Sequence, residues 1–96
     1  MKESVIVKQI KEHLQKKYQA QCFKHHGGIY SEAGVADLIC VIQSRFCAFE
    51  CKRPGKKATP IQLLWMERYR QAGAIVGVVD SIESVDKLLL DNIIKP

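Results

Sequence analysis

The sequence contains no apolar run that approaches the ~20 residues needed for a membrane-spanning helix. It shows no signal peptide, because Met1 is followed directly by an amphipathic segment. Repeats and low-complexity segments are absent as well. With 96 residues, of which 47% are hydrophobic, the chain is long enough to bury a core. We therefore expect one domain over residues 1–96, a cytoplasmic location and no membrane partner.

Cysteines are few, and none of them forms a CxxC pair, which argues against a zinc ribbon. They are Cys22, Cys40, Cys47 and Cys51. Cys47 and Cys51 lie four residues apart on an expected strand, hence roughly 13 Å apart at ~3.3 Å per residue. A disulfide needs Cα atoms within about 7 Å. We expect reduced thiols that fill the core, as in cytoplasmic proteins.

Acidic residues are outnumbered, with 10 Asp and Glu against 15 Lys and Arg and a net charge of +5. Such an excess favours polyanionic partners such as nucleic acid. Charge alone is equally compatible with a basic soluble protein that has no such partner. No group of aromatic residues resembles a base-stacking platform, which argues against RNA as the substrate.

Hydrophobic spacing predicts the first half of the fold. Apolar residues four apart, from Ile6 to Leu14, indicate a helix over residues 3–18, and "QCFKH" is typical of a short strand. The glycine-rich residues 27–34 are expected to form a loop. The apolar run 35–42 and residues 45–52 are predicted to be strands on either side of a tight turn. Because that turn is so short, the two strands should form an antiparallel hairpin.

Capping residues predict the second half. Thr59, Pro60 and Gln62 suit the N-cap, first and third positions of a helix that ends near Gly73. The run 74–79 is typical of a buried strand, and Ser81 can cap a final helix. The expected order is α-β-β-β-α-β-α. This is a mixed α/β fold whose central mixed sheet is flanked by helices, with the last β-α-β unit pairing in parallel.

Three polar residues occur at the strand ends of the expected hairpin. Mirroring Asp37 across the turn at residues 43–44 brings it opposite about residue 50, so Asp37 and Glu50 should be neighbours. Glu50 and Lys52 are two apart on one strand and face the same side. Adjacent carboxylates can hold Mg²⁺, and a lysine beside them can orient a nucleophile or offset charge on a phosphate. A purely structural Glu50–Lys52 ion pair is the alternative.

Two further residues have both a functional and a structural interpretation. Glu3 shares the apolar face of the first helix, where a carboxylate needs a partner or a metal, although an acid is also favourable at any helix start. Gln62 could help to arrange the site, or it could only complete a capping box with Thr59.

The residues around these acids carry positive or titratable groups that could contact DNA. They are His25 and His26 before the glycine-rich segment, and Arg53, Lys56 and Lys57 in the loop "RPGKK". A solvated loop is the default for such a run, but its position next to the acids suits contacts with the phosphate backbone.

These motifs resemble the virus-type replication-repair nuclease (VRR-NUC) domain of the PD-(D/E)XK nuclease superfamily. The resemblance rests on Asp37, on Glu50-Cys51-Lys52 followed by "RPG", and on Thr59-Pro60-x-Gln62. It extends over essentially the whole chain, from "ESVIVKQIKEHL" to "AGAIVGVVDSIES". One departure is Ala36, where the superfamily often has proline before the aspartate; this change should alter strand entry and not the chemistry.

The resemblance implies a restriction-endonuclease-like core and a Mg²⁺- or Mn²⁺-dependent DNA endonuclease. By matching positions, Glu3, Asp37, Glu50 and the backbone carbonyl of Cys51 would bind metal. Asp37, Glu50, Lys52 and Gln62 would form the catalytic set. Short members of the family from phage and bacteria look like homodimers that act on branched DNA, including four-way junctions, which points to DNA repair.

Other interpretations stay open from the sequence. The chain could be a non-catalytic nucleic-acid-binding module on the same fold, or a nuclease for flap or RNA substrates. For the homodimer there is one hint from the residues themselves. The apolar run from Leu63 to Met66 wraps most of the way round the second helix, so part of it must be covered by a partner copy or by the final helix.

Overall fold

A computed structural model describes residues 1–25 and 36–96 of the chain. Its elements are α1 (Glu3–Tyr18), β1 (Gln21–Lys24), β2 (Leu38–Ile42), β3 (Arg45–Cys51), α2 (Pro60–Gln71), β4 (Ile75–Val79) and α3 (Ile82–Asp91). This is the predicted order. The predicted loop at residues 27–34 and His26 lie outside the described residues. Among those described, no helix combines the length and apolarity needed to cross a membrane.

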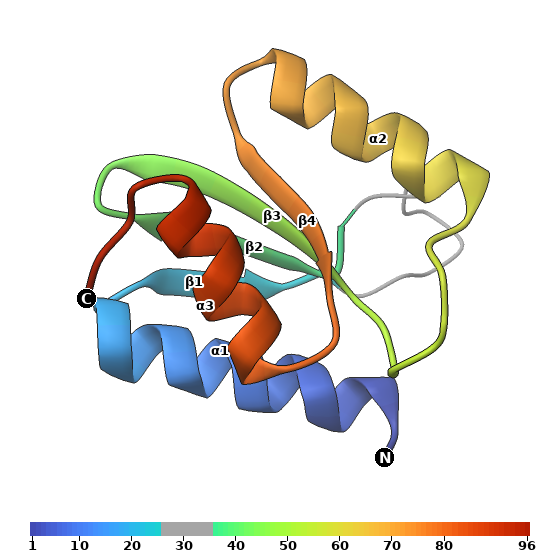
Figure 1. The fold of residues 1–96 in the computed structure, drawn as a ribbon, viewed down its shortest axis with the longest axis horizontal. Coiled ribbons are helices and arrows are strands. Elements are labelled where there is room, and N and C mark those ends of the chain that lie inside the picture. Colours follow the sequence, from blue (N-terminus) through green and yellow to red (C-terminus); the bar gives the residue numbers. More distant parts are fainter. Residues whose placement is uncertain (26–35) are drawn as a thin grey trace.

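The strands form one mixed sheet in the order β1-β2-β3-β4 (Figure 1). β2 pairs with β1 and β3 in antiparallel fashion, while β3 and β4 are parallel. Gln43 and Ser44 form the turn between β2 and β3, and both have positive φ angles of 50° and 66°. Two consecutive residues with positive φ match the right-handed twist of a hairpin. The predicted hairpin, its turn and the parallel β-α-β unit are therefore confirmed.

The two faces of the sheet are covered unequally. α1 and α3 pack together on one face, where Ile10, Leu14 and Leu89 enclose the main core against Leu38 and Phe49 (Figure 1). α2 packs on the other face over β3 and β4, around a smaller cluster of buried residues with Tyr69 and Val76 beside it. That cluster consists of Ala36, Ile39 and Ala48. Side chains of Phe23, Val41 and Phe46 on this second face are 44–58% exposed.

Local signals explain where the helices begin. Thr59 Oγ1 accepts the Gln62 N–H at 3.3 Å and the Gln62 side chain accepts the Thr59 N–H, so the predicted capping box starts α2. Ser81 and Ser84 form the same arrangement at the start of α3. α1 has no side-chain cap at Lys2, and its buried apolar face holds it in place instead.

Three details differ from the sequence-based expectation. β2 begins at Leu38 rather than at residue 35, so Asp37 precedes the strand, and β3 ends at Cys51. α3 does not cover the apolar run of α2, because within the described residues α3 packs against α1 and β4 only. Leu63 and Leu64 are accordingly 53% and 46% exposed.

Candidate functional site

The paired strands place three polar residues in one row. β2 and β3 pair Leu38 with Phe49, which sets Asp37 opposite Glu50, as the mirrored hairpin predicts. On the other side, the His25 N–H donates to the Asp37 carbonyl at 2.6 Å and extends the β1–β2 pairing by one residue. Residues paired across antiparallel strands point to the same face. His25, Asp37 and Glu50 thus face the side on which α2 lies.

The hydrogen-bond phase brings the two carboxylates especially close. Asp37 directs its backbone carbonyl toward β1, so it occupies the non-hydrogen-bonded position relative to β3. Opposed residues at such positions have the shorter Cα separation, about 4.5 Å, and their side chains approach most closely. The charge of Asp37 consequently raises the pKa of Glu50, while a hydrogen bond with Glu50 lowers the pKa of Asp37.

Glu50 is the one buried charged residue in the described part of the chain, with 2% of its surface exposed. Its Oε1 accepts a hydrogen bond from Gln62 Nε2 at 2.9 Å and lies 3.5 Å from Lys52 Nζ. Its Oε2 is buried and finds no hydrogen-bond partner among residues 1–25 and 36–96. Burial, and then the charge of Asp37, raise the pKa of Glu50 to about 7, against the opposing effect of Lys52.

Asp37 is held from the backbone. Its Oδ2 accepts the N–H of Cys51 at 2.9 Å, which ties the residue before β2 to the last residue of β3. Burial raises the pKa of Asp37, although the Cys51 hydrogen bond and the charge of Lys52 act in the opposite direction. Two adjacent acids with raised pKa values form a site that gains from a bound cation.

Gln62 makes both contacts that the sequence left as alternatives. Its Oε1 accepts the Thr59 N–H at 2.8 Å, and its Nε2 donates to Glu50. Because the amide oxygen is engaged with the helix start, the amino group must face Glu50. The first turn of α2 thereby orients the Glu50 carboxylate and leaves Oε2 free.

A divalent metal fits this donor set. Mg²⁺ is commonly bound through one or two carboxylates and retains several waters. The unpartnered Oε2 of Glu50 beside Asp37 supplies such hard oxygen ligands. No group of three or more His, Cys, Asp or Glu side chains that could hold a metal occurs in residues 1–25 and 36–96. The negative charge of Glu3 raises the pKa of Asp37, and this is the smallest of the effects on that pKa. The role of Glu3 as a ligand, like that of the Cys51 carbonyl, stays a prediction.

Four of the five residues predicted to contact DNA fall within the described ranges, and they follow the strands that carry this pair or its neighbours. Arg53, Lys56 and Lys57 are exposed in the turn after β3, which the Lys56 N–H closes on the Arg53 carbonyl at 3.0 Å. His25 has a buried Nε2 without a hydrogen-bond partner in the described part of the chain. The sequence did not predict that His25 stands in register with Asp37, because the glycine-rich segment between β1 and β2 hides the pairing.

Two solved structures are similar to this chain. One, titled "VRR_NUC domain", is 30% identical, and the match covers 93% of this chain and 94% of that one with a TM-score of 0.75. The other, titled "VRR_NUC domain protein", is 22% identical over 95% of this chain and 87% of that one, with a TM-score of 0.69, and supports the fold alone. No protein-family model and no curated protein matches the sequence.

Proposed function

This chain belongs to the VRR_NUC family of nuclease domains, and on that premise we propose that it is a metal-dependent endonuclease that hydrolyses phosphodiester bonds in branched DNA. Its fold is the PD-(D/E)XK-like mixed α/β fold of that family. The observation that carries the proposal is the Glu50 carboxylate. One oxygen is held by Gln62 and Lys52, and the other is buried next to Asp37 without a hydrogen-bond partner among the residues that the structure describes.

Each residue of the site has a role in this proposal. Asp37 and Glu50 would hold Mg²⁺ or Mn²⁺, with Glu3 and the Cys51 carbonyl as further candidate ligands. When bound, the ion supplies an activated water and neutralises charge on the phosphate. Lys52 lies at the edge of the pair with 13% of its side chain exposed, where its ammonium group can orient the water and offset negative charge on phosphorus. Gln62 fixes the direction of Glu50.

DNA would be held by the basic groups beside the acids. Arg53, Lys56 and Lys57 follow Lys52 directly in an exposed turn, so a backbone that they contact passes close to Asp37 and Glu50. His25 would add a contact from the end of β1, with His26 after it. Such phosphate contacts are independent of sequence and weaken with salt.

A homodimer would set two such sites at a fixed distance, as cutting a four-way junction on two strands requires. Its support is the exposed apolar surface of α2, where Ile61, Leu63 and Leu64 are 45–53% exposed. Several exposed apolar side chains on one helix favour a protein partner, and a two-fold copy is the commonest one.

The test is cleavage of labelled four-way junction, flap, linear duplex and RNA by the purified chain, with Mg²⁺, Mn²⁺ or EDTA. We expect metal-dependent cutting of the junction, abolished in Asp37→Asn, Glu50→Gln and Lys52→Met while junction binding persists. Glu12→Gln is the matched control, because Glu12 is an exposed acid of α1. Binding by the wild type without cutting of any substrate would instead identify a non-catalytic module. Preferential cutting of flap or RNA would correct the substrate.

A further inference from the structure

Three cysteine side chains occupy one row across the sheet. Cys22 of β1 is paired with Cys40 of β2, which in turn is paired with Cys47 of β3. All are free thiols. The row lies three residues from the row of His25, Asp37 and Glu50, and the nuclease proposal assigns it no role.

The hydrogen-bond phase distinguishes the two possible pairs. The His25 N–H donates to the Asp37 carbonyl, so that pair is hydrogen-bonded. Hydrogen-bonded and non-hydrogen-bonded pairs alternate along an antiparallel ladder, and Cys22–Cys40, three pairs further, is therefore non-hydrogen-bonded. Its Cα separation of about 4.5 Å falls within the ~4.4–6.8 Å that disulfides adopt. Cys40 then directs its backbone toward β3, so Cys40–Cys47 is a hydrogen-bonded pair with the wider spacing of about 5.5 Å, which disulfides also adopt.

Access to the thiols favours Cys22–Cys40 over Cys40–Cys47. Cys22 is half-buried on the edge strand, whereas Cys40, Cys47 and Cys51 are at most 1% exposed. A small oxidant therefore meets the Cys22 thiol before the deeper thiols.

We propose that Cys22 and Cys40 form a redox-modification site that closes to a cross-strand disulfide with a low-molecular-weight disulfide as oxidant. The Cys22 thiolate attacks one sulfur of the oxidant and displaces one small thiolate. The Cys40 thiolate then attacks the Cys22 sulfur of the mixed disulfide and displaces the second small thiolate. Two protein thiols are oxidised by two electrons, the oxidant is reduced to two thiols, and the protons leave with these.

The surroundings assign the order of attack. A hydrogen bond between the two thiols lowers the pKa of Cys22 and raises that of Cys40, and the positive charge of Lys11 on α1 acts in the same direction on Cys22. The accessible thiol is therefore also the one that ionises more readily, and the thiolate is the attacking form.

The disulfide would link the first strand of the sheet, β1, covalently to its neighbour β2. It closes a covalent loop that contains residues 23–39, and so reduces the chain entropy of the unfolded state. The tie lies three residues from both His25 and Asp37, the strand ends that carry the candidate site.

The experiment equilibrates the purified full chain with oxidised or reduced glutathione. In the oxidised sample we expect two of the four thiols to be lost, a peptide map that joins Cys22 to Cys40, and a Tm higher by about 5 °C or more. Dithiothreitol should reverse all three changes. Cys22→Ser should keep its remaining thiols and its Tm under oxidation, and Cys47→Ser should behave as the wild type does.

Three outcomes would overturn the proposal. They are four intact thiols in oxidised glutathione, a peptide map that joins Cys40 to Cys47, and a Cys22–glutathione adduct that never resolves. The map of the wild-type protein decides between the pairs even if a cysteine variant fails to fold. None of these readouts involves DNA or metal, so the result is independent of the nuclease proposal.

Discussion

At the scale of single residues, the burial of Glu50 costs the fold solvation energy. This residue is buried in its charged form only at the expense of solvation, and the nearby carboxylate of Asp37 adds repulsion. Neither Lys52 nor Gln62 reaches Oε2. A residue that weakens the metal-free protein and faces a second acid is typical of a functional site rather than of a stabilising ion pair.

The raised pKa of Glu50, about 7 instead of 4.5, predicts how stability depends on pH. Between these two values the unfolded chain loses the proton that the folded chain keeps, so Glu50 lowers the free energy of unfolding as pH rises. In EDTA, we expect Glu50→Gln to have a higher Tm than the wild type at pH 8 and an equal Tm at pH 4. Thermal melts over this range measure the difference.

A bound metal ion should offset the loss of stability that Glu50 causes at pH 8. A cation held by Asp37 and Glu50 binds only the folded state, so Mg²⁺ or Mn²⁺ should raise the Tm of the wild type. In Glu50→Gln the rise should be much smaller, and in the control Glu12→Gln it should match the wild type. An equal shift in all three proteins would place the bound ion elsewhere.

At the scale of elements, the first turn of α2 serves as a cap and as a support for the site. Thr59→Ala removes the hydroxyl cap and should lower the free energy of unfolding by about 1 kcal/mol. It keeps the backbone N–H that holds the Gln62 amide, so cleavage should fall only slightly. Gln62→Ala loses the contact with Glu50 as well and should reduce kcat far more.

Chemical denaturation and cleavage rates of the same two variants measure both effects. Thr59→Ser, which retains a hydroxyl, is the control and should match the wild type in both. If Gln62→Ala were destabilised but cut at the full rate, capping would be the only role of Gln62.

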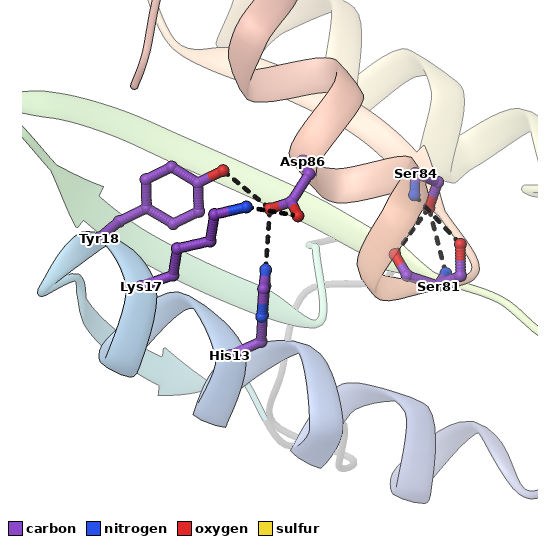
Figure 2. A network of polar contacts seen from close by, with 6 residues as sticks. All are labelled: His13, Lys17, Tyr18, Ser81, Ser84 and Asp86. Atoms are coloured by element: carbon purple, nitrogen blue, oxygen red, sulfur yellow. Dashed lines mark hydrogen bonds and ion pairs between the residues drawn. The ribbon is translucent and has the colours of Figure 1, made fainter. Parts of the chain in front are cut away.

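A second feature at the scale of elements is a network of polar side chains that joins α1 to α3. Asp86 of α3 accepts hydrogen bonds from Tyr18 at 2.7 Å and from Lys17 at 3.0 Å, and its Oδ1 lies 2.8 Å from His13 Nε2 (Figure 2). Its pKa is lowered because these hydrogen bonds outweigh the burial that would raise it. The network is partly buried, and the roles of its members are structural.

Removing the acceptor of this network should destabilise the protein. Asp86→Ala leaves Tyr18 and His13 without their partner, and we expect the free energy of unfolding to fall by roughly 1–3 kcal/mol. Asp91→Ala, which removes only the exposed pair with Lys87 on the same helix, should change it by at most about 0.5 kcal/mol. Because the pKa of Asp86 is lower in the folded than in the unfolded protein, its stabilisation is present above the unfolded pKa. This stabilisation is lost as pH falls through the lower pKa of the folded state. Equal effects of both variants would contradict this role.

At the scale of the whole molecule, the sequence predicted the order of elements and the short-range pairing. The hairpin register followed from a two-residue turn, and the start of α2 followed from Thr59, Pro60 and Gln62. These features depend on neighbouring residues. The pairing of β1 with β2 spans a long glycine-rich segment, so the alignment of His25 with Asp37 and of Cys22 with Cys40 became visible only in the structure.

The placement of α2 also needed the structure. Its apolar run could have been covered by α3, but α3 lies with α1 on the opposite face of the sheet (Figure 1). Within α2, Met66 is the buried residue, and it is 8% exposed. Packing among residues 1–25 and 36–96 thus leaves Leu63 and Leu64 of this helix exposed.

The exposed surface of α2 predicts the effect of one substitution on assembly. If a second copy covers Leu63 and Leu64, a charge at Leu64 must be buried without a partner, and Leu64→Asp should shift the protein from dimer to monomer in light scattering after gel filtration. The matched control is Val41→Asp, because Val41 is similarly exposed, at 48%, but lies on the outer part of the sheet. The Val41→Asp variant should remain a dimer.

Two outcomes would contradict this prediction. A monomeric wild type would remove the dimer from the proposed function. Monomerisation by Val41→Asp alone would place the dimer interface on the exposed face of the strands instead of on α2. Because the residues of the proposed active site all come from one chain, the Leu64→Asp monomer should, under the proposed function, still nick DNA but no longer cut a junction on two strands at once.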